Sequence, residues 1–441
     1  MEPAGGDSRV AQRTSVEQGR RYALLALILF AAIFTIGAQS WVRFFLDPKV
    51  ANGIPEHLFT QADFPAIAIG SRIVANGRGA QLYDLDAQLE EQRSLIAGGY
   101  IRLSTSESLQ YPYPYTPFIA VLWSPLSGLS PLVGKAIWDL LNIAMLAGGL
   151  WYLLLSLPLP RITQLLLLLA AITSFPFIVN LEQGQSSGVV MLGFAGGIAL
   201  LRRERDLPAG LLFGLLALKV QWLPLLVLVL LFKRRWWALA GLAATVSALS
   251  LLAIAVMGTS WIPDYLRVLE GAQRWDRALL LDPQASHSLS GGVIALFGRG
   301  SEGALRIISL AATLLSAGFL LYVWRGAWRP GTARWDALMA ITLLATMFTN
   351  LQLNTHDLCL LALPAALGIS YLYQSPKGEG VKVAWYALLW GSYIVPALLL
   401  PQTFASPIRI TTWLVAGMLG LLSWLLLSRS AHRDNAATTA Q

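Results

Sequence analysis

Charge and cysteine are both scarce in this sequence. Asp, Glu, Lys and Arg make up only 13% of the 441 residues, whereas 56% are hydrophobic. An average globular domain carries about 25% charged residues, so the composition argues against an ordinary water-surrounded fold. The single cysteine, Cys359, has no partner in the chain, which excludes an intramolecular disulfide. No segment repeats at a period of about 20–50 residues, so a solenoid is not expected.

The positive charges that remain lie in short connections between apolar runs. The net charge is +8, which by itself is also compatible with nucleic-acid binding. Clusters of Lys and Arg beside apolar runs mark the cytoplasmic loops of membrane proteins, so we expect membrane lipids as partners and no nucleic acid. The clusters are Arg202, Arg203 and Arg205; Lys233, Arg234 and Arg235; and Arg325, Arg329 and Arg334.

The apolar runs predict an all-α polytopic membrane protein. A span needs about 20 apolar residues, and the positive-inside rule orients each run in turn. This procedure predicts about ten full spans and places the N-terminus in the cytoplasm. The spans are expected at residues 22–46, 132–157, 162–180, 188–201, 236–257, 304–324, 335–348, 358–373, 383–400 and 408–427.

Two loops and two tails complete the predicted topology. The long first loop, residues 47–116, and a second loop, residues 258–290, are expected outside the cytoplasm. Residues 1–21 and 429–441 are polar and are expected to be cytoplasmic tails, the first of them disordered. The domain between the tails, residues 22–428, is predicted to be a single transmembrane unit.

Residues 207–232 do not fit a simple span. Cations flank both ends, so both ends are expected in the cytoplasm, yet the segment is too short to cross twice at about 1.5 Å per residue. A short re-entrant hairpin that turns around Lys219, Gln221 and Pro224 resolves the conflict, because irregular backbone at membrane depth is tolerated inside protein. The alternative is one long span with an orientation violation nearby.

Asp63 is the candidate catalytic residue of the first loop. It stands before Phe64-Pro65, where an Asp serves well as a helix N-cap. The other interpretation is a general base held at the membrane surface, within reach of a lipid-linked substrate. Both hold together only if capping leaves the carboxylate available.

Other polar residues of the two loops offer further contacts. Asp84-Leu85-Asp86 has the form of a metal-binding Asp-x-Asp pair, but the match is short and no metal site is predicted. Tyr113 and Tyr115 alternate with prolines in an extended stretch, and they are either interfacial anchors or platforms for a sugar ring. His287 lies in a second loop rich in charge and tryptophan, which suits either recognition of a phosphate and a sugar or an interfacial loop with solvated faces. His356 stands where apolar sequence begins, and it is either a phosphate contact or part of a simple turn.

Several motifs in a fixed order resemble glycosyltransferase family 87 over residues 20–400. They are Ala62-Asp63-Phe64, the segment from Gly77 to Tyr83, Tyr113-Pro114 through Pro125-Leu126, Trp138 to Asn142, Glu182-Gln183-Gly184-Gln185, and Ala209-Gly210 through Lys219 to Pro224. The resemblance implies a GT-C-type fold. It also implies an inverting transferase that takes a hexose, typically mannose, from a polyprenyl phosphate outside the cytoplasm.

The resemblance implies roles for individual residues as well. Asp63 matches the family's catalytic base, which deprotonates the hydroxyl of a lipid or glycan acceptor. A phosphate is already a good leaving group, so a second acidic carboxylate is not required, in contrast to hydrolases. The residues expected to bind substrate are Arg72, Tyr113, Tyr115, Gln185, Lys219, His287 and His356, with Arg72, Lys219 and His356 as candidates for the phosphate. No cofactor is expected, because the lipid-linked sugar is itself the activated donor.

A transporter or a flippase for lipid-linked sugars is the alternative function. Such a protein needs a midplane site built from broken helices, and only residues 207–232 have that character. Stable transfer of the sugar to an acceptor separates the two functions.

Overall fold

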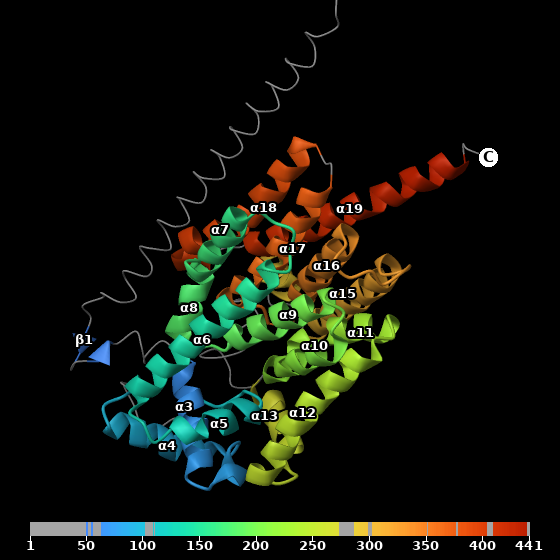
Figure 1. Ribbon diagram of the computed structural model, residues 1–441. Coiled ribbons are helices and arrows are strands. Elements are labelled where there is room, and N and C mark those ends of the chain that lie inside the picture. Colours follow the sequence, from blue (N-terminus) through green and yellow to red (C-terminus); the bar gives the residue numbers. More distant parts are fainter. Residues whose placement is uncertain are drawn as a thin grey trace, which may run out of the picture.

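The computed structural model describes residues 50–51, 54–55, 63–101, 109, 111–272, 286–298, 302–350, 352–375, 378–403 and 409–438. These ranges are predominantly helical, as the apolar sequence predicts, and they include one short antiparallel pair, β1 (Val50–Ala51) and β2 (Ile54–Pro55). Figure 1 shows long helices packed as a bundle, with short helices gathered at one end. The predicted tail 1–21 and the first predicted span, 22–46, lie outside the described residues.

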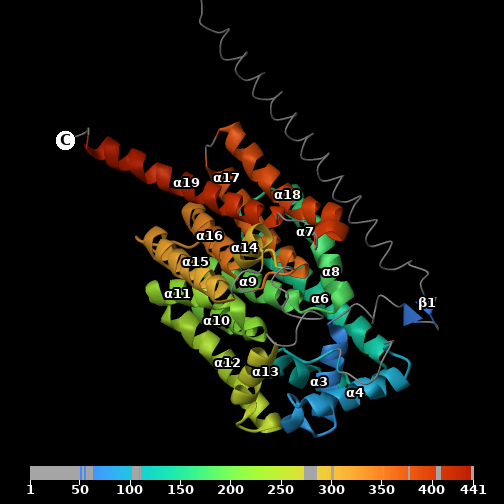
Figure 2. The same cartoon turned by 180° about the vertical axis from the view of Figure 1, so that it is seen from behind.

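Short helices from the predicted first loop, and from residues 117–126 directly after it, form a module at that end. They are α3 (Phe64–Ala75), the 3₁₀ turn η1 (Gly79–Gln81), α4 (Leu85–Ala97), α5 (Pro117–Trp123) and the 3₁₀ turn η2 (Ser124–Leu126). Pro65 and Pro117 stand in the first turns of α3 and α5, where a missing N–H costs nothing. Both views place this module away from α18 and α19, and it has its own apolar core, which includes Phe64 and Trp123 (Figures 1 and 2).

The other described helices form the bundle. Its helices are α6 (Pro131–Leu154), α7 (Arg161–Ile172), α8 (Phe175–Gln183), α9 (Ser187–Arg202), α10 (Asp206–Phe213), η3 (Gly214–Trp222), α11 (Pro224–Phe232), α12 (Trp236–Met257), α13 (Trp261–Ala272), α14 (Leu289–Phe297), α15 (Glu302–Val323), α16 (Ala333–Thr349), η5 (Thr355–Leu361), α17 (Ala362–Gln374), α18 (Glu379–Thr403) and α19 (Ile410–Thr438).

Five helical stretches among the described residues are long and apolar enough to cross a membrane, or six if a bent pair counts as one span. They are Pro131–Leu154, Trp236–Met257, Gly303–Val323, Thr355–Gln374 and Ile410–Ser428, and the bent pair is α7 with α8, at 43°. The chain is therefore polytopic. Other predicted spans coincide with shorter helices, such as the 16-residue α9 and the 17-residue α16, so the count of ten stays a prediction.

Two helices show features that the apolar runs did not predict. The candidate span Ile410–Ser428 ends where the last predicted span ends, and the backbone of α19 stays helical beyond it to Thr438. The predicted span at residues 162–180 is not one straight helix, because Pro176 begins a new helix after the break at Thr173 and Ser174. Proline at the first turn starts a helix more readily than it continues one.

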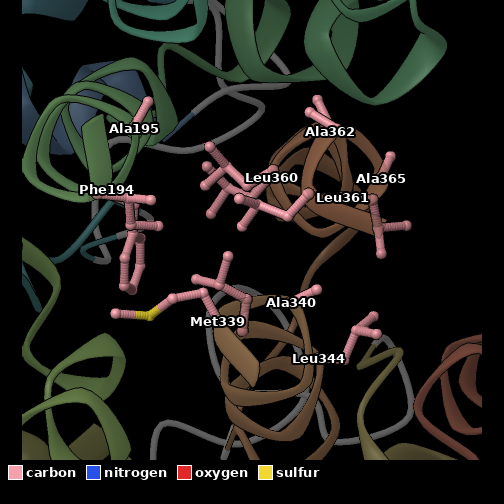
Figure 3. Packing of buried hydrophobic residues seen from close by; sticks show 14 of the residues in the cluster. Phe194, Ala195, Met339, Ala340, Leu344, Leu360, Leu361, Ala362 and Ala365 are labelled. Atoms are coloured by element: carbon pink, nitrogen blue, oxygen red, sulfur yellow. The ribbon is translucent and has the colours of Figure 1, made fainter. Parts of the chain in front are cut away.

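A large apolar core holds the helices next to the polar residues 355–357 in place. Figure 3 shows Phe194 of α9, Met339 and Leu344 of α16, and Leu361 and Ala365 of η5 and α17 gathered in one cluster. The last turn of η5 and the start of α17 are thus held by packing on two other helices. Because residues 355–357 begin the same element, their side chains gain a fixed position.

The segment from α10 to α11 reverses direction. The backbone at Lys219 leaves helical geometry (φ −133°, ψ 77°) within η3. The two ends of the segment meet, since Arg235 Nη2 lies 2.5 Å from Asp206 Oδ2. One continuous helix across residues 207–232, the alternative that the sequence left open, is therefore wrong.

Glycines let α10 and α12 approach closely. A Cβ at Gly210 would lie 1.9 Å from the carbonyl oxygen of Ala238, and one at Gly241 would lie 2.2 Å from that of Leu207. We expect Gly210→Ala to lower the thermal unfolding midpoint in detergent, because a backbone must shift and overpacking costs about 1–3 kcal/mol. Gly148→Ala on α6, where a Cβ meets nothing within 4 Å, is the matched control and should not lower it. Equal midpoints for the two variants would contradict this packing.

Candidate active site

Asp63 turns its carboxylate toward the bundle. It occupies the N-cap position of α3, but its side chain makes no capping hydrogen bond, so the N-cap interpretation does not account for the carboxylate. Instead, Gln185 Nε2 donates a hydrogen bond to Asp63 Oδ2. The same Nε2 lies 3.3 Å from the hydroxyl of Tyr115. Three residues that the sequence singled out are thus in direct contact.

Three charged or ionisable side chains form a second cluster, the Lys219 group: Lys219, His356 and Asp357. Lys219 Nζ donates to Asp357 Oδ1 at 2.9 Å and lies 3.4 Å from His356 Nε2. Lys219 is only 7% exposed and Asp357 only 2%. A buried charge is stable when it is paired, so the ion pair accounts for a lysine at this depth. The non-helical backbone at Lys219 is what carries the residue out of the regular helix.

Further hydrogen bonds hold the Lys219 group in place. Asp357 accepts from Ser187 Oγ at 3.2 Å and from the backbone N–H of Asn354 at 3.3 Å. His356 Nδ1 lies 2.6 Å from Gln183 Oε1, so the ring donates there and presents Nε2 to Lys219 as an acceptor. In this tautomer the neutral ring of His356 accepts a hydrogen bond from Lys219 at Nε2 and so orients the lysine. Only a doubly protonated ring has an Nε2–H group that can donate to a phosphate.

One turn connects Asp63 with the Lys219 group. In the turn formed by residues 183–187, between α8 and α9, every second residue holds one member of the site. Gln183 contacts His356, Gln185 contacts Asp63, and Ser187 contacts Asp357. The turn therefore sets the carboxylate of Asp63 and the Lys219 group relative to each other.

Gly184 makes this turn possible. Its backbone is left-handed (φ +65°), which suits glycine at the end of a helix. A Cβ there would also lie 2.5 Å from the Cβ of Phe64, the residue after Asp63. Both constraints bring the turn against the start of α3, where Asp63 stands.

Polar side chains of α6 and α8 brace the same turn. Trp138 Nε1 donates to the Gly184 carbonyl at 2.7 Å. Asn142 Oδ1 and Asn180 Oδ1 accept the backbone N–H groups of Gly188 and Ser187 at 3.1 and 3.0 Å. These asparagines replace the missing side-chain cap of α9, whose N-cap residue Ser186 makes no capping bond.

His287 stands at the edge of the site. Its Nε2 lies 3.1 Å from Thr355 Oγ1, and its backbone N–H donates to the Leu353 carbonyl at 2.7 Å. Thr355 directly precedes His356, so the second loop reaches the Lys219 group through this contact. Burial, together with the positive charge of Arg409, lowers the pKa of His287 to about 4, so its ring is neutral near pH 7.

Arg72 and Tyr113 take other positions than the sequence suggested. Arg72 Nε donates to Glu91 Oε2 at 3.0 Å and joins α3 to α4, so a carboxylate already matches its charge. Tyr113 is 0% exposed, its hydroxyl donates to the Thr116 carbonyl at 2.7 Å, and it accepts from the Ala120 N–H at 3.0 Å. Tyr113 meets the site only through its ring contact with Tyr115, at 5.5 Å between centroids.

Sequence reasoning left Gln183, Ser187 and Asp357 out of the candidate residues. Asp357 is the centre of the Lys219 group, yet it is 138 positions from Lys219 along the chain. The available signal was its place beside His356 at the start of an apolar run, where ionisable residues are costly. The spacing of Gln183, Gln185 and Ser187 is visible in the sequence. Only the left-handed turn at Gly184 shows that these alternate residues contact His356, Asp63 and Asp357.

The environment of Asp63 favours its neutral form. Burial away from water, and to a lesser extent the charge of Asp357, raise its pKa from 3.8 to about 6. The hydrogen bonds from Gln185 and Tyr115 and the charge of Lys219 act in the opposite direction. Burial and the nearby Asp63 also raise the pKa of Tyr115 well above its usual value, so Tyr115 remains a neutral hydrogen-bond donor. A carboxylate with a pKa near 6 is ionised at neutral pH and is a stronger base than an exposed one.

The Asp-x-Asp pair of the first loop has a structural position. Asp84 Oδ1 accepts the backbone N–H groups of Asp86 and Ala87 at 2.8 and 3.2 Å and caps α4. Within the described ranges, no three His, Cys, Asp or Glu side chains gather as a metal site.

Comparison with known proteins identifies the family. The model of glycosyltransferase family 87 matches residues 113–349, more than half of the chain. The matched region contains Tyr115, Gln185 and Lys219, whereas Asp63 and His356 lie outside it. No curated protein and no solved structure matches this chain. The chain belongs to glycosyltransferase family 87 and is a multi-pass membrane glycosyltransferase.

Proposed function

We propose that this enzyme transfers a hexose, with mannose as the expected sugar, from a polyprenyl phosphate to a lipid or glycan acceptor, with inversion at the anomeric carbon. Asp63 is the general base, and Lys219 receives the phosphate. The observation that carries the proposal is the 183–187 turn, which holds the carboxylate of Asp63 and the Lys219–Asp357 pair from alternate residues. A single displacement needs this combination of one general base and one cation that binds the leaving phosphate.

The hydrogen bonds of Asp63 support its role as the proton acceptor. Gln185 donates to Oδ2 and Tyr115 also bonds to this carboxylate, so both donors hold it in place while it takes the proton of the acceptor hydroxyl. The hydroxyl oxygen bonds to the anomeric carbon as the bond from that carbon to the phosphate oxygen breaks. The electron pair stays on the phosphate, whose growing negative charge is stabilised by Lys219. Tyr115, half-buried beside Gln185, is placed to contact the acceptor.

The membrane setting follows from the cations and from the donor. The ends of the α10–α11 segment meet beside Arg205, Lys233 and Arg234, which the positive-inside rule assigns to the cytoplasm. The segment is then a re-entrant hairpin whose break at Lys219 lies deep in the membrane, and Asp63 faces the outside of a bacterial inner membrane. A polyprenyl tail holds the donor in the bilayer at about 0.8 kcal/mol per buried methylene, so the site has to open to the lipid. The donor carries the activated sugar, and no further cofactor is proposed.

Transfer from purified components tests the function. The protein is reconstituted in liposomes with polyprenyl-phosphate mannose labelled in the sugar, and with octyl mannoside as a surrogate acceptor. We expect labelled octyl disaccharide or, with a poor acceptor, release of free sugar at a lower rate. A nucleotide-linked mannose in place of the lipid donor should yield no product. Movement of intact donor across the bilayer without bond exchange would support the transporter alternative instead.

The pH dependence of transfer reports on Asp63. Because only its ionised form accepts a proton, kcat/KM should fall about tenfold per pH unit below a midpoint near 6. In Gln185→Ala the hydrogen bond that lowers this pKa is lost, so the midpoint should move to higher pH. Initial rates between pH 5 and 8 measure both midpoints. Thr116→Ser, which keeps its hydroxyl and does not contact Asp63, should leave the midpoint in place. Identical midpoints in the wild type and Gln185→Ala would remove Gln185 from the control of the base.

A further inference from the structure

Lys219 acts electrostatically on both halves of the site. It pairs with Asp357 at 2.9 Å, and its positive charge also reaches Asp63, whose proton affinity it lowers. Among the residues that the structure describes, the other ionisable groups that interact with Asp63 are Asp357 on η5 and Tyr111 and Tyr115 before α5. Lys219 is the one cation in this set. The proton affinity of Asp63 therefore depends on which anion the ammonium group of Lys219 pairs with.

The partners of Lys219 allow it to be redirected. Asp357 is held independently by Ser187 Oγ and by the backbone N–H of Asn354, so it stays in position if the lysine shifts. His356 is likewise fixed through Gln183. The lysine itself sits on non-helical backbone between α10 and α11. The rigid partners and the flexible four-carbon stem of lysine favour movement of the ammonium group alone.

Resting on the proposed function, we propose that the donor's phosphate strengthens Asp63 as a base by drawing the charge of Lys219 to itself. The bound phosphodiester adds a negative charge beside Lys219 and cancels the field that Lys219 exerts on Asp63. Asp63 then removes the acceptor proton more readily, and only when a donor is in place. When the bond to the phosphate breaks, the phosphate gains a second negative charge, which Lys219 meets while Asp63 holds the proton.

Donor binding and proton binding are therefore linked. An anion beside Lys219 should raise the pKa of Asp63 from about 6 by about one unit, since one neighbouring charge has effects of this size. By linkage, an anionic ligand that raises this pKa must take up protons when it binds near pH 6–7. At about pH 6.5 a rise of about one unit corresponds to an uptake of about half a proton per ligand.

Calorimetric titration measures this uptake without any turnover. The probe is a polyprenyl methyl phosphodiester, whose single acidic group stays ionised, titrated into the full-length protein in detergent at pH 6.5. Titrations in two buffers with different ionisation enthalpies give the number of protons bound. We expect uptake of about half a proton in the wild type and none in Asp63→Asn. In Gln185→Ala, where Asp63 binds its proton more tightly before the ligand arrives, the pH of greatest uptake should rise.

The outcomes separate this inference from the proposed function. Failure of the wild type to bind the phosphodiester contradicts the proposed phosphate-binding role of Lys219. Binding without proton uptake is compatible with that role, but it contradicts the coupling between donor binding and protonation of Asp63. Equal uptake in wild type and Asp63→Asn assigns the proton to His356 or His287 and overturns it as well. An unchanged pH of greatest uptake in Gln185→Ala has the same consequence.

Discussion

Asp63→Asn is expected to lower the rate of sugar transfer by about 10²–10⁴-fold, the usual contribution of a general base. The amide keeps the size of the side chain and accepts a hydrogen bond from Gln185, but it cannot take the acceptor proton. Rates in the liposome assay, with donor and acceptor both varied, should show the loss mainly in kcat. KM for the donor should change little, because the phosphate is bound by Lys219.

The fold should survive this substitution. The pKa of Asp63 is raised from its usual 3.8 to about 6, so the folded state holds the proton more tightly. Stability is therefore lost as the pH rises from 3.8 to about 6, and the full cost of the ionised carboxylate is present above that range. At pH 8 the neutral asparagine removes this cost, and the thermal midpoint should not fall. Asp84→Asn is the matched control, because Asp84 is exposed and asparagine also caps a helix well. Transfer at the wild-type rate by Asp63→Asn would exclude Asp63 as the base.

Helices of the bundle could be predicted from the sequence where an apolar run and its flanking charges agree. The run predicted at residues 236–257 coincides with α12 (Trp236–Met257), and the run at 335–348 lies within α16 (Ala333–Thr349). The break near Lys219 was also predictable, because cations at both ends leave no consistent orientation for a single span. These are local signals, and each needs only neighbouring residues.

Contacts within the site are not local, and the sequence carries no pattern for them. Gln185 is 122 positions from Asp63, and Gln183 is 173 positions from His356. Residue type together with the family resemblance placed Asp63, Tyr115, Gln185, Lys219 and His356 among the candidates, and the structure brings these five together. Which of these residues contact one another becomes visible only in the tertiary structure.

Arg72 shows the opposite case. A cation in the first outside loop looked suitable for a phosphate, but Glu91 lies 19 positions away, on the neighbouring helix α4, and takes its charge. Residue type cannot separate a binding arginine from one that joins two helices. The distinction depends on which carboxylate lies near the arginine in the folded protein, and this is determined by the tertiary structure.

Lys219→Met is expected to abolish detectable donor use through two separate effects. Losing the cation should weaken stabilisation of the leaving phosphate by about 10²–10³-fold, as for other groups that meet developing charge. It also leaves Asp357 buried and unpaired, and breaking a buried pair in this way costs about 3–5 kcal/mol of stability. Loss of activity in the single variant therefore does not distinguish a binding role from a failure to fold.

The double variant Lys219→Met/Asp357→Asn separates the two effects. Replacing both charges removes the unpaired carboxylate, so the thermal midpoint should recover toward that of the wild type, while sugar transfer stays lost. The matched control is Arg202→Met/Asp336→Asn, which removes another buried ion pair, between α9 and α16, and should retain transfer. Transfer and stability are measured on the same preparations. Recovery of transfer along with stability in the Lys219 double variant would show that the lysine only balances Asp357, and the phosphate would then need another cation.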